Sequence, residues 1–230
     1  MKNQGIIIVL LAMLCPIVAK AQLRVGPTIG FNLSSAQYSK EWREDIRDDG
    51  GKNQPVLRLQ IGVTGEYALT DQLYVQSGLL INGAGGKTKV DYSDFGYEAK
   101  STEKILLTYL DIPLTARYQL TEGDGFSLSG WGGFIVGFAV SGKLKSISRV
   151  EGEREDYDES IEFGSSRSDD LKGGDFRLAL GAVAESEDFP IQLKIALQQG
   201  LADIYPDNNF DYGLRNFMFS LSASYFFELE

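Results

Sequence analysis

Residues 106–140 alternate between apolar side chains and small or polar ones with a period of two. This period is typical of β-strands, in which successive side chains point to opposite faces. Two alternating arms, residues 106–120 and 126–140, flank the polar run TEGDG. Each arm exceeds the roughly 9 to 11 residues that a tilted transmembrane strand needs. The segment is therefore interpreted as a transmembrane β-hairpin. Its apolar face includes Leu106, Leu110, Ile112, Leu114, Tyr118, Phe126, Phe134, Phe138 and Val140, and the other face includes Asp111, Pro113, Thr115, Arg117, Gly137, Ala139 and Ser141.

The same alternation predicts six further strands, separated by stretches rich in charge, glycine or proline that are typical of turns and loops. We assign the apolar face of every strand to lipid and the alternate residues to the lumen. The eight predicted strands span residues 23–33, 56–69, 73–84, 106–120, 126–140, 175–185, 191–200 and 216–227.

The predicted connections alternate between long and short. Outer-membrane barrels have an even number of strands, short periplasmic turns and longer external loops. We therefore predict an all-β fold, an eight-stranded antiparallel up-and-down transmembrane β-barrel, located in the outer membrane with both termini periplasmic and the long loops extracellular. The polar stretch 85–103 can also extend the central hairpin beyond the membrane. Long connections are expected at 34–55, 85–103, 142–174 and through Pro206, and short ones at 70–72, 121–125 and 186–190.

A soluble eight-stranded barrel of the lipocalin type is the alternative architecture, and it would enclose the apolar faces. The faces rich in glycine, alanine and charge would then lie in water. Charged lumen positions that alternate with apolar stripes flanked by aromatic residues favour the membrane barrel.

Residues 1–21 have the features of a secretory signal peptide. Lys2 precedes an apolar core from Ile6 to Val18, which is shorter than the roughly 20 residues of a transmembrane helix. The following Ala-Lys-Ala predicts cleavage between Ala21 and Gln22, which leaves residues 22–230 as the barrel domain.

The composition excludes several classes of function. The chain has 22 Lys+Arg, 32 Asp+Glu and a net charge of -10, so nucleic acid is not an expected partner. It contains no histidine, and its one cysteine, Cys15, lies in the signal segment. Histidine-dependent catalysis and the usual zinc sites are therefore excluded, and we expect no cofactor.

Charged residues on the lumen faces form the strongest candidate site. With strands running alternately up and down, five of these residues point inward in the periplasmic half of the barrel, and a sixth lies nearer the middle. Opposite charges that pair in a confined lumen avoid the cost of an unpaired buried charge, and an eight-stranded barrel is just wide enough to be filled by side chains. The cluster therefore predicts a structural ionic plug or, alternatively, a gated small pore. Its members are Arg24, Glu66, Arg117, Glu185 and Lys194, with Asp111 nearer the middle.

Two acidic stretches carry the carboxylate oxygens that calcium prefers as ligands. Residues 151–162 contain seven carboxylates, but Arg154 interrupts them and the glycine of an EF-hand is missing, so a solvated loop is expected. In residues 207–213 the glycine comes one position late, which excludes an EF-hand loop.

Pro113 lies inside a predicted strand. It predicts a bulge or a missing ladder hydrogen bond there, because proline has no backbone N–H to donate.

Several segments resemble the PorT-like outer-membrane β-barrel family of Bacteroidetes-type bacteria. They are VGPTIGFNLS, YLDIPLTARY, GWGGFIVGF and a last strand ending in Tyr-Phe-Phe. The resemblance covers essentially the whole mature chain and implies an architecture similar to the small OmpA and OmpX barrels. Its name-giving member belongs to a secretion apparatus, which implies envelope or secretion proteins as partners.

Three functions follow from these observations. The first is a structural anchor whose exposed loops serve envelope integrity, adhesion or a secretion or transport assembly. The second is a narrow porin-like channel for small solutes. The third is an outer-membrane enzyme, for which the sequence singles out no catalytic residues.

Overall fold

The computed structural model describes residues 23–94, 97–123, 125–150, 153–164, 166, 168–186, 188–206 and 212–229. The predicted signal peptide, with the cleavage site at Ala21 and Gln22, lies outside these residues.

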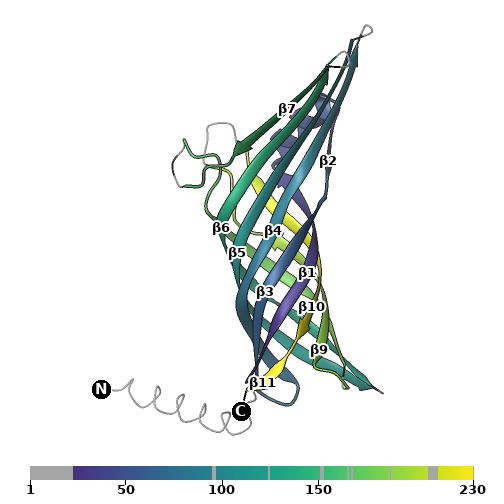
Figure 1. Ribbon diagram of the computed structural model, residues 1–230, viewed down its shortest axis with the longest axis vertical. Helices are drawn as coiled ribbons and strands as arrows, with labels where there is room; N and C mark the ends of the chain where they lie inside the picture. The colour runs from purple at the N-terminus through teal and green to yellow at the C-terminus, as the bar shows by residue number, and fades with distance from the viewer. Residues whose placement is uncertain are drawn as a thin grey trace, which may run out of the picture.

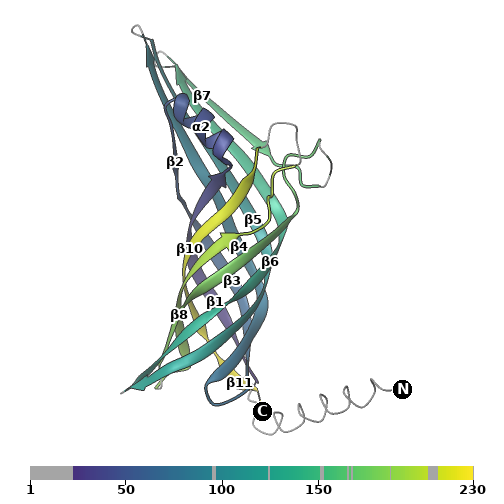
Figure 2. The same cartoon turned by 180° about the vertical axis from the view of Figure 1, so that it is seen from behind.

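Eight long strands form a closed antiparallel barrel. Each pairs with the next long strand along the chain, and β10 pairs with β1 from Thr28↔Ser224 to Tyr38↔Leu214, which closes the ring. Figures 1 and 2 show the tilted strands surrounding a single interior. The prediction of an all-β, eight-stranded up-and-down barrel is confirmed. Its strands are β1 (Leu23–Tyr38), β3 (Val56–Ala68), β4 (Leu73–Asp94), β5 (Tyr97–Gly123), β6 (Phe126–Val150), β8 (Gly174–Ser186), β9 (Ile191–Gly200) and β10 (Leu214–Tyr225).

Four short elements decorate the ring. β2 (Gly51–Gln54) pairs with β4, β7 (Glu153–Ser160) pairs with β6, and β11 (Phe227–Leu229) pairs with the start of β1. The helix α2 (Lys40–Asp48) begins at Ser39, whose side chain accepts a hydrogen bond from the Trp42 backbone N–H at 3.4 Å. Among the described residues, no helix has the length and apolar character needed to cross a membrane.

β4, β5 and β6 are much longer than predicted, and they project beyond the rest of the ring (Figure 1). We name the projecting ends of these three strands the strand extension. The β4–β5 ladder runs from Leu73↔Tyr118 to Asp94↔Tyr97, so residues 85–103 do extend the hairpin. The prediction of a loop over 151–162 is wrong for Glu153–Ser160, which form the exposed strand β7 against β6. In the projecting ends of β4, β5 and β6 and in β7, backbone pairing continues without an apolar face. No alternation of apolar and polar residues therefore marks these segments as strands in the sequence.

The two faces of the barrel strands have the polarity of a membrane barrel. Large apolar side chains such as Leu57, Ile61 and Leu114 are more than half exposed on the outside. Polar side chains such as Asn32, Gln76 and Arg117 are buried in the lumen. This confirms the assignment of faces over the predicted strands, with one correction at the end of residues 126–140.

The correction comes from a register shift in β6. Thr108 pairs with Ser141 and Tyr109 with Ala139, so Val140 has no partner on β5 and forms a bulge. Beyond the bulge the alternation is reversed, and Ser141, predicted on the lumen face, lies on the outer one. At Pro113 the β4–β5 register is unchanged, but the ladder skips from Ser77↔Leu114 to Leu80↔Asp111, as expected for a residue without an N–H.

Candidate functional site

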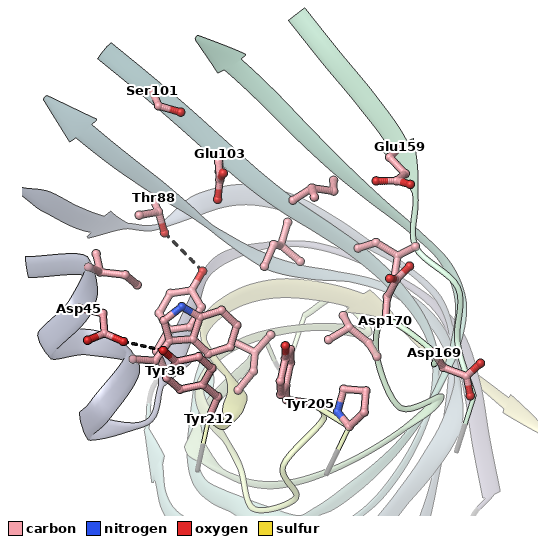
Figure 3. Close-up of a pocket in the computed structure, with 18 of the residues that line it drawn as sticks. Tyr38, Asp45, Thr88, Ser101, Glu103, Glu159, Asp169, Asp170, Tyr205 and Tyr212 are labelled. Carbon is pink, nitrogen blue, oxygen red and sulfur yellow. Dashed lines mark hydrogen bonds between the residues drawn. The ribbon is translucent and has the colours of Figure 1, made fainter. Parts of the chain in front are cut away.

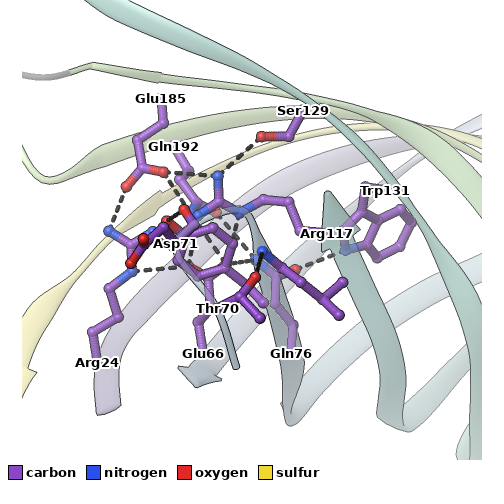
Figure 4. A network of polar contacts seen from close by, with 12 residues as sticks. Arg24, Glu66, Thr70, Asp71, Gln76, Arg117, Ser129, Trp131, Glu185 and Gln192 are labelled. Carbon is purple, nitrogen blue, oxygen red and sulfur yellow. Dashed lines mark hydrogen bonds and ion pairs between the residues drawn. The ribbon is translucent and has the colours of Figure 1, made fainter. Parts of the chain in front are cut away.

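The end of the barrel where β11 pairs with β1, here the terminal end, contains a dense polar network that we name the lower cluster. It comprises Arg24, Glu66, Arg117 and Glu185, which come from β1, β3, β5 and β8 (Figure 4). Arg117 donates from Nε and Nη2 to the two Glu66 oxygens at 3.0 and 2.9 Å. Its Nη1 lies 3.0 Å from Glu185, and Arg24 bridges both carboxylates from the other side. Arg117 and Glu66 are fully buried, so each charge is compensated inside the barrel.

Neutral side chains complete the hydrogen bonding of the lower cluster. Gln76 donates to Glu66 and accepts a hydrogen bond of 2.7 Å from the Trp131 indole N–H. Lys194 differs from the other predicted members, since its ammonium group lies 4.4 Å from the centroid of the Trp131 ring and no ion pair of it is recorded among the described residues. The structure thus brings Arg24, Glu66, Arg117 and Glu185 into direct contact and places Lys194 beside them.

Asp111, which the sequence analysis grouped with these residues, belongs to a second network, the middle cluster. It lies six residues from Arg117 along β5 toward the mouth, which is about 20 Å of strand. Its ion-pair partner is the fully buried Arg177, which also lies 3.2 Å from Asp175. Asn82 donates to Asp111 at 2.6 Å and Asn216 donates to Asp175 at 2.9 Å. Two carboxylates therefore share one guanidinium at this level.

Apolar layers alternate with the two ionic clusters inside the lumen. A small group around Trp131 and Val183 lies on strands β6, β8 and β9. A larger group lies toward the mouth and includes Leu107, Tyr109, Ile204 and Met218, each of which is fully buried. The lumen is thus occupied by packed side chains at successive levels from the terminal end upward.

A cavity of about 690 Å³ opens above these layers, at the end of the barrel opposite the terminal end. One wall is aromatic: the Trp42 ring of α2 lies 4.6, 5.0 and 5.2 Å, centroid to centroid, from the rings of Tyr38, Tyr205 and Tyr212. Figure 3 shows Tyr38, Tyr205 and Tyr212 close to one another in the lining of this mouth cavity. A pocket of this size accommodates a small ligand or a few residues of a peptide.

Among the described residues, the charged side chains that line the mouth cavity are all acidic. Asp49 comes from the end of α2. The other five are Asp45 from α2, Glu103 from β5, Glu159 from β7, and Asp169 and Asp170 from the following loop (Figure 3). Tyr212 donates a hydrogen bond of 2.6 Å to Asp45, which ties the loop before β10 to the helix and raises the pKa of the Tyr212 hydroxyl. None of the described lining residues is a lysine or an arginine.

The sequence analysis missed most residues of the middle cluster and of the mouth, and Arg177, Asp175 and Trp42 show why. Arg177 alternates with the apolar residues of the strand predicted over 175–185, so the pattern placed it inside the lumen. The pattern could not show that it lies at the same level along the barrel as Asp111. Asp175 stands at the start of the same strand, where a polar residue normally marks a strand end. Trp42 lies in a stretch predicted as loop, and only its N-cap serine and the acidic first turn could have indicated a helix.

Solved structures with similar folds are bacterial outer-membrane proteins. Ail of Yersinia pestis shares 12% identity, with 89% of this chain and 98% of that chain covered and a TM-score of 0.31. Neisserial surface protein A shares 10% identity, with coverage of 90% and 99% and a TM-score of 0.37. OprG of Pseudomonas aeruginosa shares 12% identity, with coverage of 91% and 96% and a TM-score of 0.31.

Sequence comparison identifies the family. No curated protein matches the chain. A family model described as "outer membrane protein beta-barrel domain" matches residues 19–222, which is nearly the whole barrel and includes every residue of the lower and middle clusters. The chain therefore belongs to the outer membrane β-barrel domain family, and it is an outer-membrane barrel protein.

Proposed function

We propose that this protein is a non-conducting, non-enzymatic anchor in the outer membrane, and that its working surface is the mouth cavity. The observation that carries the proposal is the series of filled levels in the lumen. Arg117 and Arg177 are both fully buried, each is held by carboxylates, and they occupy the interior at two separate heights. The narrow channel considered from the sequence would need both levels to open.

The orientation that we propose rests on the lengths of the connections. Short turns join β3 to β4, β5 to β6 and β8 to β9 at the terminal end, whereas the strand extension and the mouth cavity lie at the other end. We place the terminal end in the periplasm, after removal of residues 1–21, and the mouth outside the cell. The resemblance to the PorT-like family supports envelope or secretion proteins as neighbours in the membrane.

A recognition role for the mouth is supported by its chemistry. Aromatic faces attract cations, and carboxylates pair with them. The wall combines four aromatic rings with six carboxylates, so a basic segment of an external partner matches it in charge and in size. This wall favours adhesion among the anchor roles.

Single-channel recording in a planar bilayer tests the closed lumen. The wild-type protein is expected to give no discrete conductance steps. Arg117→Ala and Arg177→Ala, each alone, should also remain silent, because the other cluster still closes the interior. Discrete wild-type steps that grow in either single variant would establish the channel instead.

Tryptophan fluorescence tests recognition at the mouth. Trp131→Phe leaves Trp42 as the only tryptophan of the chain, so its emission reports on the cavity. A lysine oligomer should change this emission in a saturable manner, and Glu103→Gln with Glu159→Gln should weaken the response. A glutamate oligomer is the matched probe of opposite charge. An equal response to both peptides would contradict a charge-selective mouth.

A further inference from the structure

The outer face of the strand extension carries a group of lysines that we name the lysine patch. It comprises six of the twelve lysines of a chain whose net charge is -10. They lie on β2, β4, β5 and β6, on one side of one sheet. The members are Lys52, Lys87, Lys89, Lys104, Lys143 and Lys145.

Strand alternation fixes the side on which the patch lies. Thr88, Glu103 and Leu144 line the mouth cavity, so their strand neighbours point the opposite way, to the outside of the barrel. Lys87 and Lys89 flank Thr88, Lys104 follows Glu103, and Lys143 and Lys145 flank Leu144. The three strands therefore present ammonium groups to the exterior, and β5 also presents the Glu103 carboxylate to the cavity.

The register places like charges directly opposite one another. Lys104 pairs with Lys87 on β4 and with Lys145 on β6, so three lysines stand in one row across three strands. Lys52 likewise pairs with Lys89. Directly opposed residues have Cβ atoms only about 4.5 to 5.5 Å apart, and like charges in such pairs are destabilising. This arrangement is unfavourable unless an anion compensates it.

The described part of the chain supplies little of that compensation. Lys145 forms an ion pair of 2.8 Å with Asp158 of β7, and Lys143 lies in the field of the same carboxylate. No ion pair of the other four lysines is recorded among the described residues. The patch therefore keeps a net positive charge that a multiply charged anion could neutralise.

The patch adjoins the lipid-facing surface. Moving toward the mouth, the outward apolar positions include Ile81 on β4, Leu106 on β5 and Phe138 and Val140 on β6. On each strand the first charged outward residue after this band is a lysine: Lys87, Lys104 or Lys143. Lys104 lies two residues beyond Leu106, about 7 Å along the strand, which is within reach of a lipid headgroup.

We propose that the lysine patch binds the phosphate groups of a lipid whose acyl chains lie against the apolar band of β4, β5 and β6. The contiguous apolar band favours a lipid over a free phosphate ion, because the same molecule then contacts both surfaces. Binding would hold the strand extension at the membrane surface, with the mouth cavity on its other face. This site is separate from the lumen and does not depend on a ligand in the mouth.

Lipid binding by the folded full barrel in neutral detergent tests the proposal. The probes are a bisphosphorylated glycolipid, the same glycolipid without phosphates, and inorganic pyrophosphate. We expect the phosphorylated lipid to bind about a hundredfold more tightly than the dephosphorylated one, since each basic residue near an anionic lipid surface contributes roughly fivefold and the central row has three. Pyrophosphate alone should compete only weakly, because it lacks the acyl chains.

Matched variants separate the patch from overall charge. Lys87→Gln, Lys104→Gln and Lys145→Gln together should bring the two lipids to similar affinities. Lys40→Gln, Arg43→Gln and Arg47→Gln on the exposed helix α2 remove the same charge elsewhere and should leave the preference intact. Replacement of the three patch lysines by arginine should retain the preference for the phosphorylated lipid. Binding by this variant also shows that the sheet folds when these positions are substituted. A phosphate preference that survives the glutamine variant, or equally tight binding of pyrophosphate, would overturn the proposal.

Discussion

Opposite charges are paired in the terminal half of the lumen, whereas the described charged residues of the mouth are all of one sign. In the lower cluster two arginines meet two carboxylates, and the central pair, Arg117 and Glu66, is fully buried. At the mouth, six carboxylates line an open cavity without a lysine or arginine among the described lining residues. Complementary charges at close quarters hold strands together, whereas uncompensated charge facing solvent is available to an external partner.

The strand extension repeats this contrast across the thickness of one sheet. β4, β5 and β6 direct Glu103 and other cavity residues inward and the lysine patch outward. Neighbouring residues of opposite charge on one strand, such as Glu103 and Lys104, can therefore serve two surfaces of opposite charge. The lower cluster and the mouth can be distinguished by how far the free energy of unfolding falls when a single charged side chain is removed from each.

The largest expected effect is at the centre of the lower cluster. Glu66→Ala removes the carboxylate shared by Arg24 and Arg117 and leaves buried guanidinium groups under-compensated. We expect the free energy of unfolding to fall by about 3 to 5 kcal/mol. Urea titration of the barrel in lipid vesicles, followed by tryptophan fluorescence, measures the change.

Glu103→Ala at the mouth is the matched control, because Glu103 is exposed in the cavity wall. Its effect on the free energy of unfolding should stay within about 0.5 kcal/mol. Similar losses in the two variants would remove the distinction between a paired lumen and an unpaired mouth.

An intermediate effect is expected where β6 approaches the middle cluster. A Cβ atom at Gly137 would lie 2.8 Å from both Arg177 Nη2 and Asp111 Oδ1, so Gly137→Ala should displace this ion pair. We expect a loss of about 1 to 3 kcal/mol in the free energy of unfolding. Gly130→Ala on the same strand is the control, since its Cβ would meet only Leu120, at 3.9 Å. Equal stability of the two variants would show that the middle cluster tolerates displacement.

The barrel core could be predicted from the sequence because apolar and polar residues alternate wherever a strand faces lipid on one side. That signal fixed the number of long strands, their order and the faces of Leu114 and Arg117. The alternation is absent beyond the apolar band, where β7 and the mouth-side halves of β4 and β5 are paired through the backbone and carry polar residues on both faces. Apolar alternation could therefore not predict these segments as strands. The bulge at Val140 was also hidden, because one inserted residue leaves composition and local pattern almost unchanged.

The lumen clusters were only partly predictable for a related reason. Parity places Arg24, Glu66, Arg117 and Asp111 inside the barrel, but contact between them depends on height, which the stagger between strands determines. Asp111 therefore pairs with Arg177, and it does not contact the lower cluster with which the sequence analysis had grouped it. The mouth could not be inferred at all, because Trp42 and Tyr212 are 170 residues apart in sequence and meet only through the docking of α2.

The smallest expected effect is local to the mouth. Tyr212→Phe removes the 2.6 Å hydrogen bond to Asp45 but keeps the ring that stacks on Trp42. Amide hydrogen exchange in α2 should accelerate several-fold, because the helix loses one of its ties to the loop before β10. Exchange in the barrel strands and the urea midpoint should not change, since the lumen clusters are untouched. Tyr157→Phe on the exposed strand β7 is the control and should leave α2 unaffected. Faster exchange in β5 or β8 of the Tyr212 variant would mean that the mouth and the lumen are coupled. Unchanged exchange in α2 would mean that aromatic packing alone holds the helix over the cavity.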